Sequence, residues 1–224
     1  LATQVDSDGV LKWGAHNLLS LNVSIRNNPT SAVQPPKNGM QVYVISGNVN
    51  IRSGISPIIP INTEGTVEVF IKKVDPSFSG IGTIDIRDVA AVFNIDNETI
   101  DPPGPTSTRI MTFTSIENTG NGWFKLVIKG FRTNVGLGFS DLRVGNTGDS
   151  YYIAGYTAYR SDLGGMVNNP DRGDSYVPTT TAARFLSRRG HHIWNGTEWV
   201  NKGILIESEA RTNLQIDSEN PMAN

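Results

Sequence analysis

The sequence of 224 residues has no cysteine, no long apolar run and no excess of positive charge, and each absence excludes a class of protein. Without cysteine there is neither a disulfide framework nor a thiolate metal site. No apolar stretch approaches the roughly 20 residues that cross a bilayer as a helix, so we expect no membrane insertion. The 19 Lys and Arg residues are outnumbered by 21 Asp and Glu residues, and this balance argues against nucleic-acid binding.

The sequence motifs of common enzyme classes are also missing. There is no Walker phosphate-binding loop, no HExxH zinc motif, no GxSxG nucleophile motif and no dinucleotide-binding glycine pattern. His191 and His192 are adjacent, and on a strand they would point to opposite faces, so they are poorly placed to share one metal ion. We therefore predict that the protein is not an enzyme, has no metal site and needs no cofactor.

Glycine and proline are abundant, with 23 and 12 residues respectively. They separate short runs of Val, Ile, Thr and aromatic residues, with turn signals such as Asn195-Gly196 between the runs. Helical periodicity is almost absent. This composition is typical of an all-β sandwich or barrel, and we expect at most one or two helical turns.

Alternation of apolar and polar residues gives the expected strands. In residues 16–25 the apolar side chains Leu19, Leu21, Val23 and Ile25 alternate strictly, which predicts the first strand. Strands or strand pairs are also expected at 41–51, 66–74, 83–95, 110–116, 122–131, 137–144 and 148–160, and a hairpin is expected at 191–200. The segments 122–131 and 148–160 are predicted to lie deep in the sandwich.

Several stretches carry a resemblance to a known group of proteins. Residues 203–214, GILIESEARTNL, are similar to a "GLLIE..ARTNL" signature of bacteriophage tail, head-fibre and other virion appendage proteins. That signature leads into a jelly-roll module similar to carbohydrate-binding modules. The marks of such a module resemble residues 122–124, 151–156 and 175–179, and its lead-in resembles residues 2–13. Ala154 stands where the module has tryptophan.

The resemblance implies a jelly-roll β-sandwich, similar to carbohydrate-binding modules and concanavalin-like folds, in an extracellular virion. On this basis residues 1–15 are a lead-in linker, 16–183 the sandwich, and 184–214 a hairpin and linker. Residues 212–216 also echo residues 16–20. Two interpretations of residues 215–224 stay open, the start of a second module or a chance similarity.

Sugar binding by such a module would use flat aromatic rings that stack on pyranose faces. The alternative for each ring is a place in the core, where most tryptophan and tyrosine side chains lie. Calcium occurs in similar modules, and Asp141, Asp149 and Asp162 are candidate ligands that no spacing singles out. The glycan-binding candidates are Trp123, Tyr152, Tyr156 and Tyr159.

The segment from residue 184 onward has more apolar side chains than it could bury in a core of its own, which predicts packing against another subunit. A homo-oligomer, with a trimer favoured, and contacts with other virion proteins are expected. The predicted assembly residues are Arg184, Phe185, Leu186, Ile193, Trp194, Trp199, Ile204 and Ile206.

The resemblance and the apolar segment favour two functions, and a third is weaker. The protein would be a fibre or spike component that presents a glycan-binding module to a bacterial surface polysaccharide, or it would be a structural adaptor in the virion that binds no glycan. The third is a carbohydrate-binding module of a glycoside hydrolase.

Overall fold

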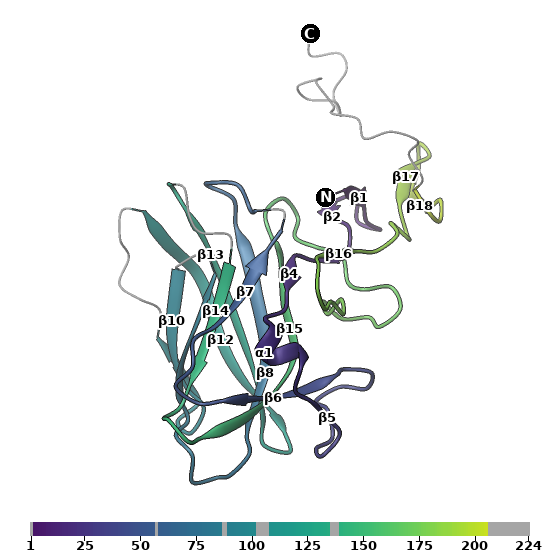
Figure 1. The fold of residues 1–224 in the computed structure, drawn as a ribbon. Coiled ribbons are helices and arrows are strands. Elements are labelled where there is room, and N and C mark those ends of the chain that lie inside the picture. Colours follow the sequence, from purple (N-terminus) through teal and green to yellow (C-terminus); the bar gives the residue numbers. More distant parts are fainter. Residues whose placement is uncertain (1, 57, 87–88, 102–107, 135–138, 206–224) are drawn as a thin grey trace.

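The computed structural model describes residues 2–56, 58–86, 89–101, 108–134 and 139–205, and these residues form a β-sandwich with a small annex at one end (Figure 1). Helix within the described residues is limited to α1 (Val23–Arg26). The prediction of an all-β protein is confirmed.

The sandwich consists of two six-stranded sheets in which every strand pair is antiparallel. The first sheet has the order β11 (Thr99–Asp101), β10 (Val89–Asn94), β9 (Ile81–Ile86), β14 (Phe139–Val144), β7 (Ile51–Ile55), β4 (Leu19–Ser20). The second sheet has the order β12 (Arg109–Gly120), β13 (Trp123–Arg132), β8 (Gly65–Lys73), β15 (Ser150–Arg160), β6 (Val42–Ser46), β5 (Pro29–Thr30).

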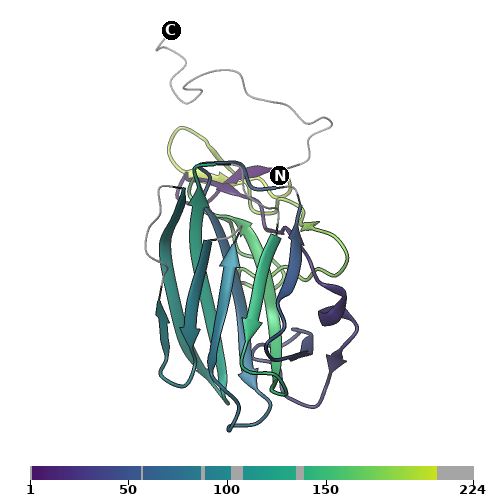
Figure 2. The same ribbon diagram turned by 60° about the vertical axis from the view of Figure 1, so that its left-hand side comes forward.

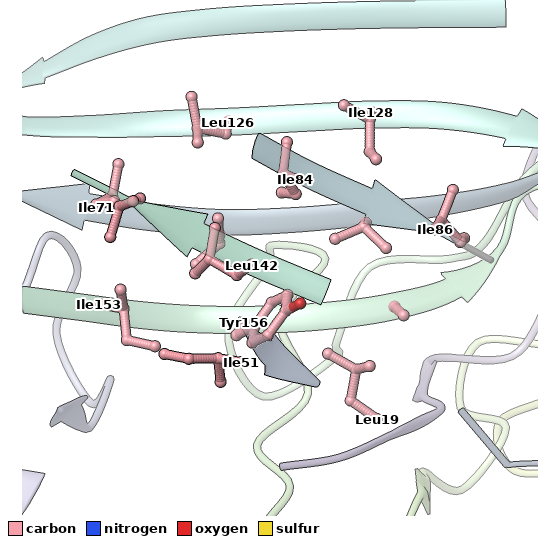
Figure 3. Packing of buried hydrophobic residues seen from close by; sticks show 14 of the residues in the cluster. Leu19, Ile51, Ile71, Ile84, Ile86, Leu126, Ile128, Leu142, Ile153 and Tyr156 are labelled. Carbon is pink, nitrogen blue, oxygen red and sulfur yellow. The ribbon is translucent and has the colours of Figure 1, made fainter. Parts of the chain in front are cut away.

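Alternate side chains from both sheets meet between them and form the main core. Leu126 and Ile128 of β13 face Ile84 of β9 and Leu142 of β14, and all four are completely buried (Figure 3). The residues that alternate with these two along β13, such as Lys125, lie on the outer face of the second sheet. The alternation read from residues 122–131 therefore places the strand correctly.

The strand β15 changes its inward-facing set halfway along its length. Tyr151 and Ile153 point into the main core, and after an irregularity between Ala154 and Thr157 the inward residue is Tyr156. Gly155 lies within the irregularity with φ of +62°, a conformation that glycine adopts without strain. This bulge explains why tyrosines seem to occupy both faces of the strand in the sequence.

The connections between the sandwich strands alternate between two opposite ends of the molecule (Figures 1 and 2). One end, here called the loop end, is formed by residues 47–50, 74–80, 95–98, 121–122 and 145–149. These connections are tied together by hydrogen bonds, for example from the Tyr151 hydroxyl to the Ser79 carbonyl at 2.6 Å and from the Ser79 amide to Asp149.

The opposite end carries the annex, defined as residues 2–15 and 184–205. It contains the hairpin β1 (Thr3–Val5) with β2 (Leu11–Trp13), and the hairpin β17 (His192–Trp194) with β18 (Trp199–Asn201). The two segments contact each other: the Gln4 side chain donates to the Arg189 carbonyl at 2.9 Å, and the Val5 amide donates to Nδ1 of His191 at 3.2 Å. Residues 1–15 are predicted as a lead-in linker and residues 184–214 as a hairpin and linker, and the described parts of these two segments contact each other.

The annex is joined to the sandwich by a short strand pair, β3 (His16–Asn17) with β16 (Arg184–Phe185). Asn17 is completely buried at this joint, and its side chain makes four hydrogen bonds with backbone groups. Its Oδ1 accepts from the amides of Leu19 and Ala158, both at 3.0 Å. Its Nδ2 donates to the carbonyls of Val177 at 2.9 Å and Tyr156 at 3.3 Å.

The prediction of one continuous strand over residues 16–25 is wrong. The chain forms β3 and β4 and then turns into α1, where the Asn22 side chain accepts from the Ser24 amide at 2.7 Å. Asparagine is a favoured helix N-cap, and this local bond competes with strand pairing. As a result Ile25 is buried while Val23, on the supposed same face, is 54% exposed.

The remaining strand predictions agree with the structure. Residues 66–74, 122–131 and 148–160 correspond to β8, β13 and β15, and residues 83–95 separate into the paired strands β9 and β10. Residues 41–51 contain β6 and the start of β7, residues 110–116 lie in β12, and residues 137–144 contain β14. The hairpin predicted at 191–200 is β17 with β18.

Candidate assembly surface and the predicted aromatic site

Trp123, the first predicted glycan-stacking residue, is only 1% exposed. Its ring lies in a second cluster on the outer face of the second sheet, with Phe70 and Tyr176 among its members. The indole Nε1 donates to the Gln34 carbonyl at 3.0 Å. The ring therefore has no open face for a sugar.

Tyr156 and Tyr159 are buried as well. The hydroxyls of Tyr156 and Ser140 are hydrogen-bonded to each other at 2.8 Å inside the core. The Tyr159 hydroxyl donates to Oε1 of Glu68 at 2.6 Å. Burial raises the pKa of both phenols above its ordinary value, so both stay protonated as hydrogen-bonding groups of the interior.

Of the four predicted glycan residues, only Tyr152 is partly exposed. It packs beside the second cluster from the outer face of β15. The structure does not bring the four rings to one open surface. The alternation of residues along a strand tells which side chains share a face of the sheet. It does not tell that loops cover the outer face of the second sheet.

The carboxylates considered for calcium are each engaged by protein donors. Asp141 receives two hydrogen bonds from the Arg52 guanidinium, both at 3.1 Å. Asp162 receives two from Arg160, at 2.9 and 2.6 Å.

Asp149 accepts from the Asn146 amide at 2.7 Å and from the Tyr151 hydroxyl at 3.1 Å. The first of these bonds is the main reason that the pKa of Asp149 lies below its ordinary value. Within the described residues, no group of three or more His, Asp or Glu side chains is arranged to hold a metal ion.

The annex, in contrast, exposes large apolar side chains. Trp194 is 51% exposed and Ile204 54%, and Phe185 and Ile193 are close to half exposed. We call these four, together with the exposed Val10 and Leu11, the annex patch. Trp194 lies 5.7 Å from Trp199, which packs on Gly9 beside Val10, so the two hairpins bring part of this set together. Exposed apolar side chains gathered in this way are typical of a surface that contacts another molecule.

The other predicted assembly residues support this patch or lie beside it. Trp199 is half-buried with its ring 5.7 Å from that of Trp194, and it packs so closely on Gly9 that a side chain there would overlap its ring. Leu186 is half-buried, and Arg184 is exposed. Ile206 lies outside the described residues.

A buried histidine, not predicted from the sequence, connects the annex to the sandwich. His16 is 1% exposed, and its ring stacks with Phe185 at 6.1 Å. Its Nδ1 donates to the Gly14 carbonyl at 2.7 Å, and its Nε2 accepts from the Arg160 amide at 3.1 Å. Both nitrogens are thus satisfied by the neutral ring, and burial lowers the pKa to about 4.

A scan against protein-family models finds no match, and a search of the curated proteins finds none. Among the described residues no helix is long and apolar enough to cross a membrane. What the protein does is therefore inferred from its residues and their geometry.

Proposed function

We propose that this protein is a structural component of a bacteriophage virion, a fibre or spike protein whose β-sandwich is joined to neighbouring subunits through the annex. The observation that carries the assembly role is the annex patch, in which Trp194 and Ile204 are more than half exposed. The virion assignment comes from the signature-like residues 203–214.

The strand order supports the jelly-roll form of the sandwich. A jelly roll has eight antiparallel strands in two four-stranded sheets, connected as two Greek keys. The inner strands of the second sheet follow the order β6, β15, β8, β13, and those of the first sheet β7, β14, β9, β10. The chain passes between the sheets in the way such an order requires, with β4, β5, β11 and β12 as additional edge strands.

The annex patch alone gives only a weak association. Full burial of a large apolar side chain contributes roughly 2 kcal/mol, so covering the exposed half of six such side chains contributes on the order of 6 kcal/mol. The cost of bringing two proteins together is at least about 4 kcal/mol. Stable assembly therefore needs further complementary contacts around the patch.

Light scattering after size-exclusion chromatography tests the proposal. We expect the protein to form a homo-oligomer, with a trimer as the first expectation, and the double variant Ile193→Ser with Trp194→Ser to remain a monomer. The control is Ile81→Ser with Val92→Ser, because these residues are equally exposed on the outer face of the first sheet. Circular dichroism checks that all variants fold. A protein that stays monomeric at high concentration contradicts the assembly role.

A second candidate function, attachment to a bacterial surface polysaccharide, has the partly exposed ring of Tyr152 in its favour. If this ring stacks on a sugar, binding on a glycan array is weakened in Tyr152→Ala and kept in Tyr152→Trp. The loss of an aromatic stacking contact costs about 1 kcal/mol or more, which is roughly a fivefold weaker affinity. Absence of any glycan bound by the unmodified protein rules this candidate out.

A further inference from the structure

A groove of about 400 Å³ lies between α1 and the connection of β6 to β7. Ile45 and Ile51 line its buried part, since both side chains belong to the main core and are only 3% exposed. Val23 of α1 and Val49 of the connection also line it, and each is about half exposed. The groove therefore offers apolar side chains that a molecule from solvent can reach.

The groove exists because the edge strands next to it are short. β5 pairs with β6 only at residues 42–43, and β4 pairs with β7 only at residues 54–55. Between β4 and β5 the chain forms α1 instead of a longer edge strand (Figure 1). Asn22 fixes the start of α1, because its Nδ2 donates to the Arg52 carbonyl at 2.9 Å and its amide donates to the Ser53 hydroxyl at 3.2 Å. The groove is thus formed before any ligand binds.

Polar side chains with unused hydrogen-bonding groups gather along the groove. Ser24, Asn27 and Ser46 line it and are exposed. In the part of the chain that the structure describes, the hydroxyls of both serines and the side-chain amide of Asn27 have no hydrogen-bond partner. Asn28 donates through Nδ2 to the Ser24 carbonyl at 2.8 Å, which leaves its Oδ1 as a further acceptor. A ligand can therefore bond to these groups without breaking an internal hydrogen bond.

The lining of the groove decides the chemical class of the ligand. None of the eight lining residues is charged, so an ionic ligand would find no opposite charge to offset the loss of its hydration. A purely apolar ligand would leave the hydroxyls and amides unpaired. A sugar matches both features, because its hydroxyls donate and accept hydrogen bonds while its C–H groups pack on valine and isoleucine. The volume also lies within the range of roughly 300–1,000 Å³ that is usual for small-molecule sites.

We propose that this groove binds a neutral saccharide, such as one or two sugar residues of an uncharged bacterial surface polysaccharide. The inference goes beyond the assembly role and does not involve the annex. It also differs from attachment through Tyr152, which lies on the outer face of the second sheet, whereas Ile45 and Ile51 of the groove belong to the core between the sheets. The two sites can therefore be changed separately.

A glycan array followed by an NMR titration tests the site. The array carries neutral and acidic bacterial polysaccharides, and the neutral one that binds most strongly is then titrated into the methyl-labelled protein. We expect the methyl signals of Val23 and Val49 to shift. Those of Ile81 and Val92 should stay in place, because these residues are equally exposed on the outer face of the first sheet.

The double variant Ser24→Ala with Asn27→Ala should bind the same polysaccharide at least roughly fivefold more weakly, because two hydrogen bonds are lost. The control is Ser7→Ala with Asn38→Ala, which removes the same two side-chain types from exposed positions outside the groove. This control and Tyr152→Ala should keep the original affinity, and circular dichroism checks that all variants fold.

The proposal is overturned if no neutral polysaccharide binds, if only acidic ones bind, or if the groove variant keeps the original affinity. Binding that weakens in Tyr152→Ala but not in the groove variant places the glycan on the outer face of the second sheet and likewise overturns it. These outcomes leave the assembly role untouched, since light scattering of the annex variants measures that role separately.

Discussion

At the scale of single residues, His16 links the protonation of one ring to the attachment of the annex. Its Nε2 must stay unprotonated to accept from the Arg160 amide, and Phe185 of the annex stacks on the same ring. Protonation would turn Nε2 into a donor that faces another donor, and it would place a charge in the interior.

We therefore expect acid to destabilise the fold through His16. The folded pKa of about 4 lies below the ordinary value of 6.5, so the unfolded chain binds the extra proton first as the pH falls. The contribution is complete above pH 6.5 and is lost between pH 6.5 and 4, and it amounts to about 3 kcal/mol at 1.36 kcal/mol for each pKa unit.

Urea unfolding measured from pH 7.5 to 4 checks this expectation. The free energy of unfolding should decrease less steeply in His16→Gln than in the unmodified protein. Equal slopes in the two proteins would exclude His16 as the titrating group.

Neither His16 nor Asn17 could be identified as a joint from the sequence. Both precede an apolar run, and a polar pair in that position is equally consistent with the exposed start of a strand. Their partners, Arg160 and Val177, are more than 140 residues away along the chain. Only the tertiary fold brings those backbone groups within hydrogen-bonding distance.

At the scale of elements, the bulge in β15 sets which tyrosines enter the core. Gly155 has φ of +62°, and a Cβ atom there would lie 3.0 Å from Phe70 and 3.1 Å from the sulfur of Met40. A side chain would therefore be both strained in its backbone and crowded by the second cluster.

Gly155→Ala should lower the free energy of unfolding by about 2 kcal/mol, since a non-glycine residue in the left-handed region costs roughly 1–3 kcal/mol. The matched control is Gly54→Ala in β7, where the new Cβ atom would have only an ordinary contact at 3.8 Å. Chemical denaturation of the two variants compares them directly. A loss in Gly155→Ala no larger than that in Gly54→Ala would mean that the bulge relaxes at no cost.

Elements differ in how well their sequence predicts them. β13 is clear because Phe124, Leu126 and Ile128 alternate with Lys125 and Lys129, and the apolar face packs in the main core. The segment that becomes β4 and α1 has an equally good alternation, but Asn22 caps a helical turn and ends it. The hydrogen bond of the Asn22 side chain thus outweighs the alternation of apolar residues, because that alternation describes only which face of a strand is buried.

At the scale of the whole molecule, composition and alternation are sufficient to predict the all-β sandwich. They are not sufficient to predict which outer face is covered, because the covering residues of the second cluster, such as Met40 and Tyr176, come from loops without a pattern. The same limit explains why Trp123 is a plausible sugar platform in the sequence and a core residue in the structure. Four of the predicted assembly residues, Phe185, Ile193, Trp194 and Ile204, are about half exposed, and their role in assembly stays a prediction.

The position of the annex has a mechanical consequence. Residues 2–15 and 184–205 lie at one end of the sandwich and are bonded to each other, for instance through Gln4 and Arg189. A pulling force applied between these two segments would be resisted first by the bonds within the annex, by the bonds of Trp13 with Gly165 and Val167, and by the β3–β16 pair. The twelve strands behind them would remain unloaded until those bonds had failed.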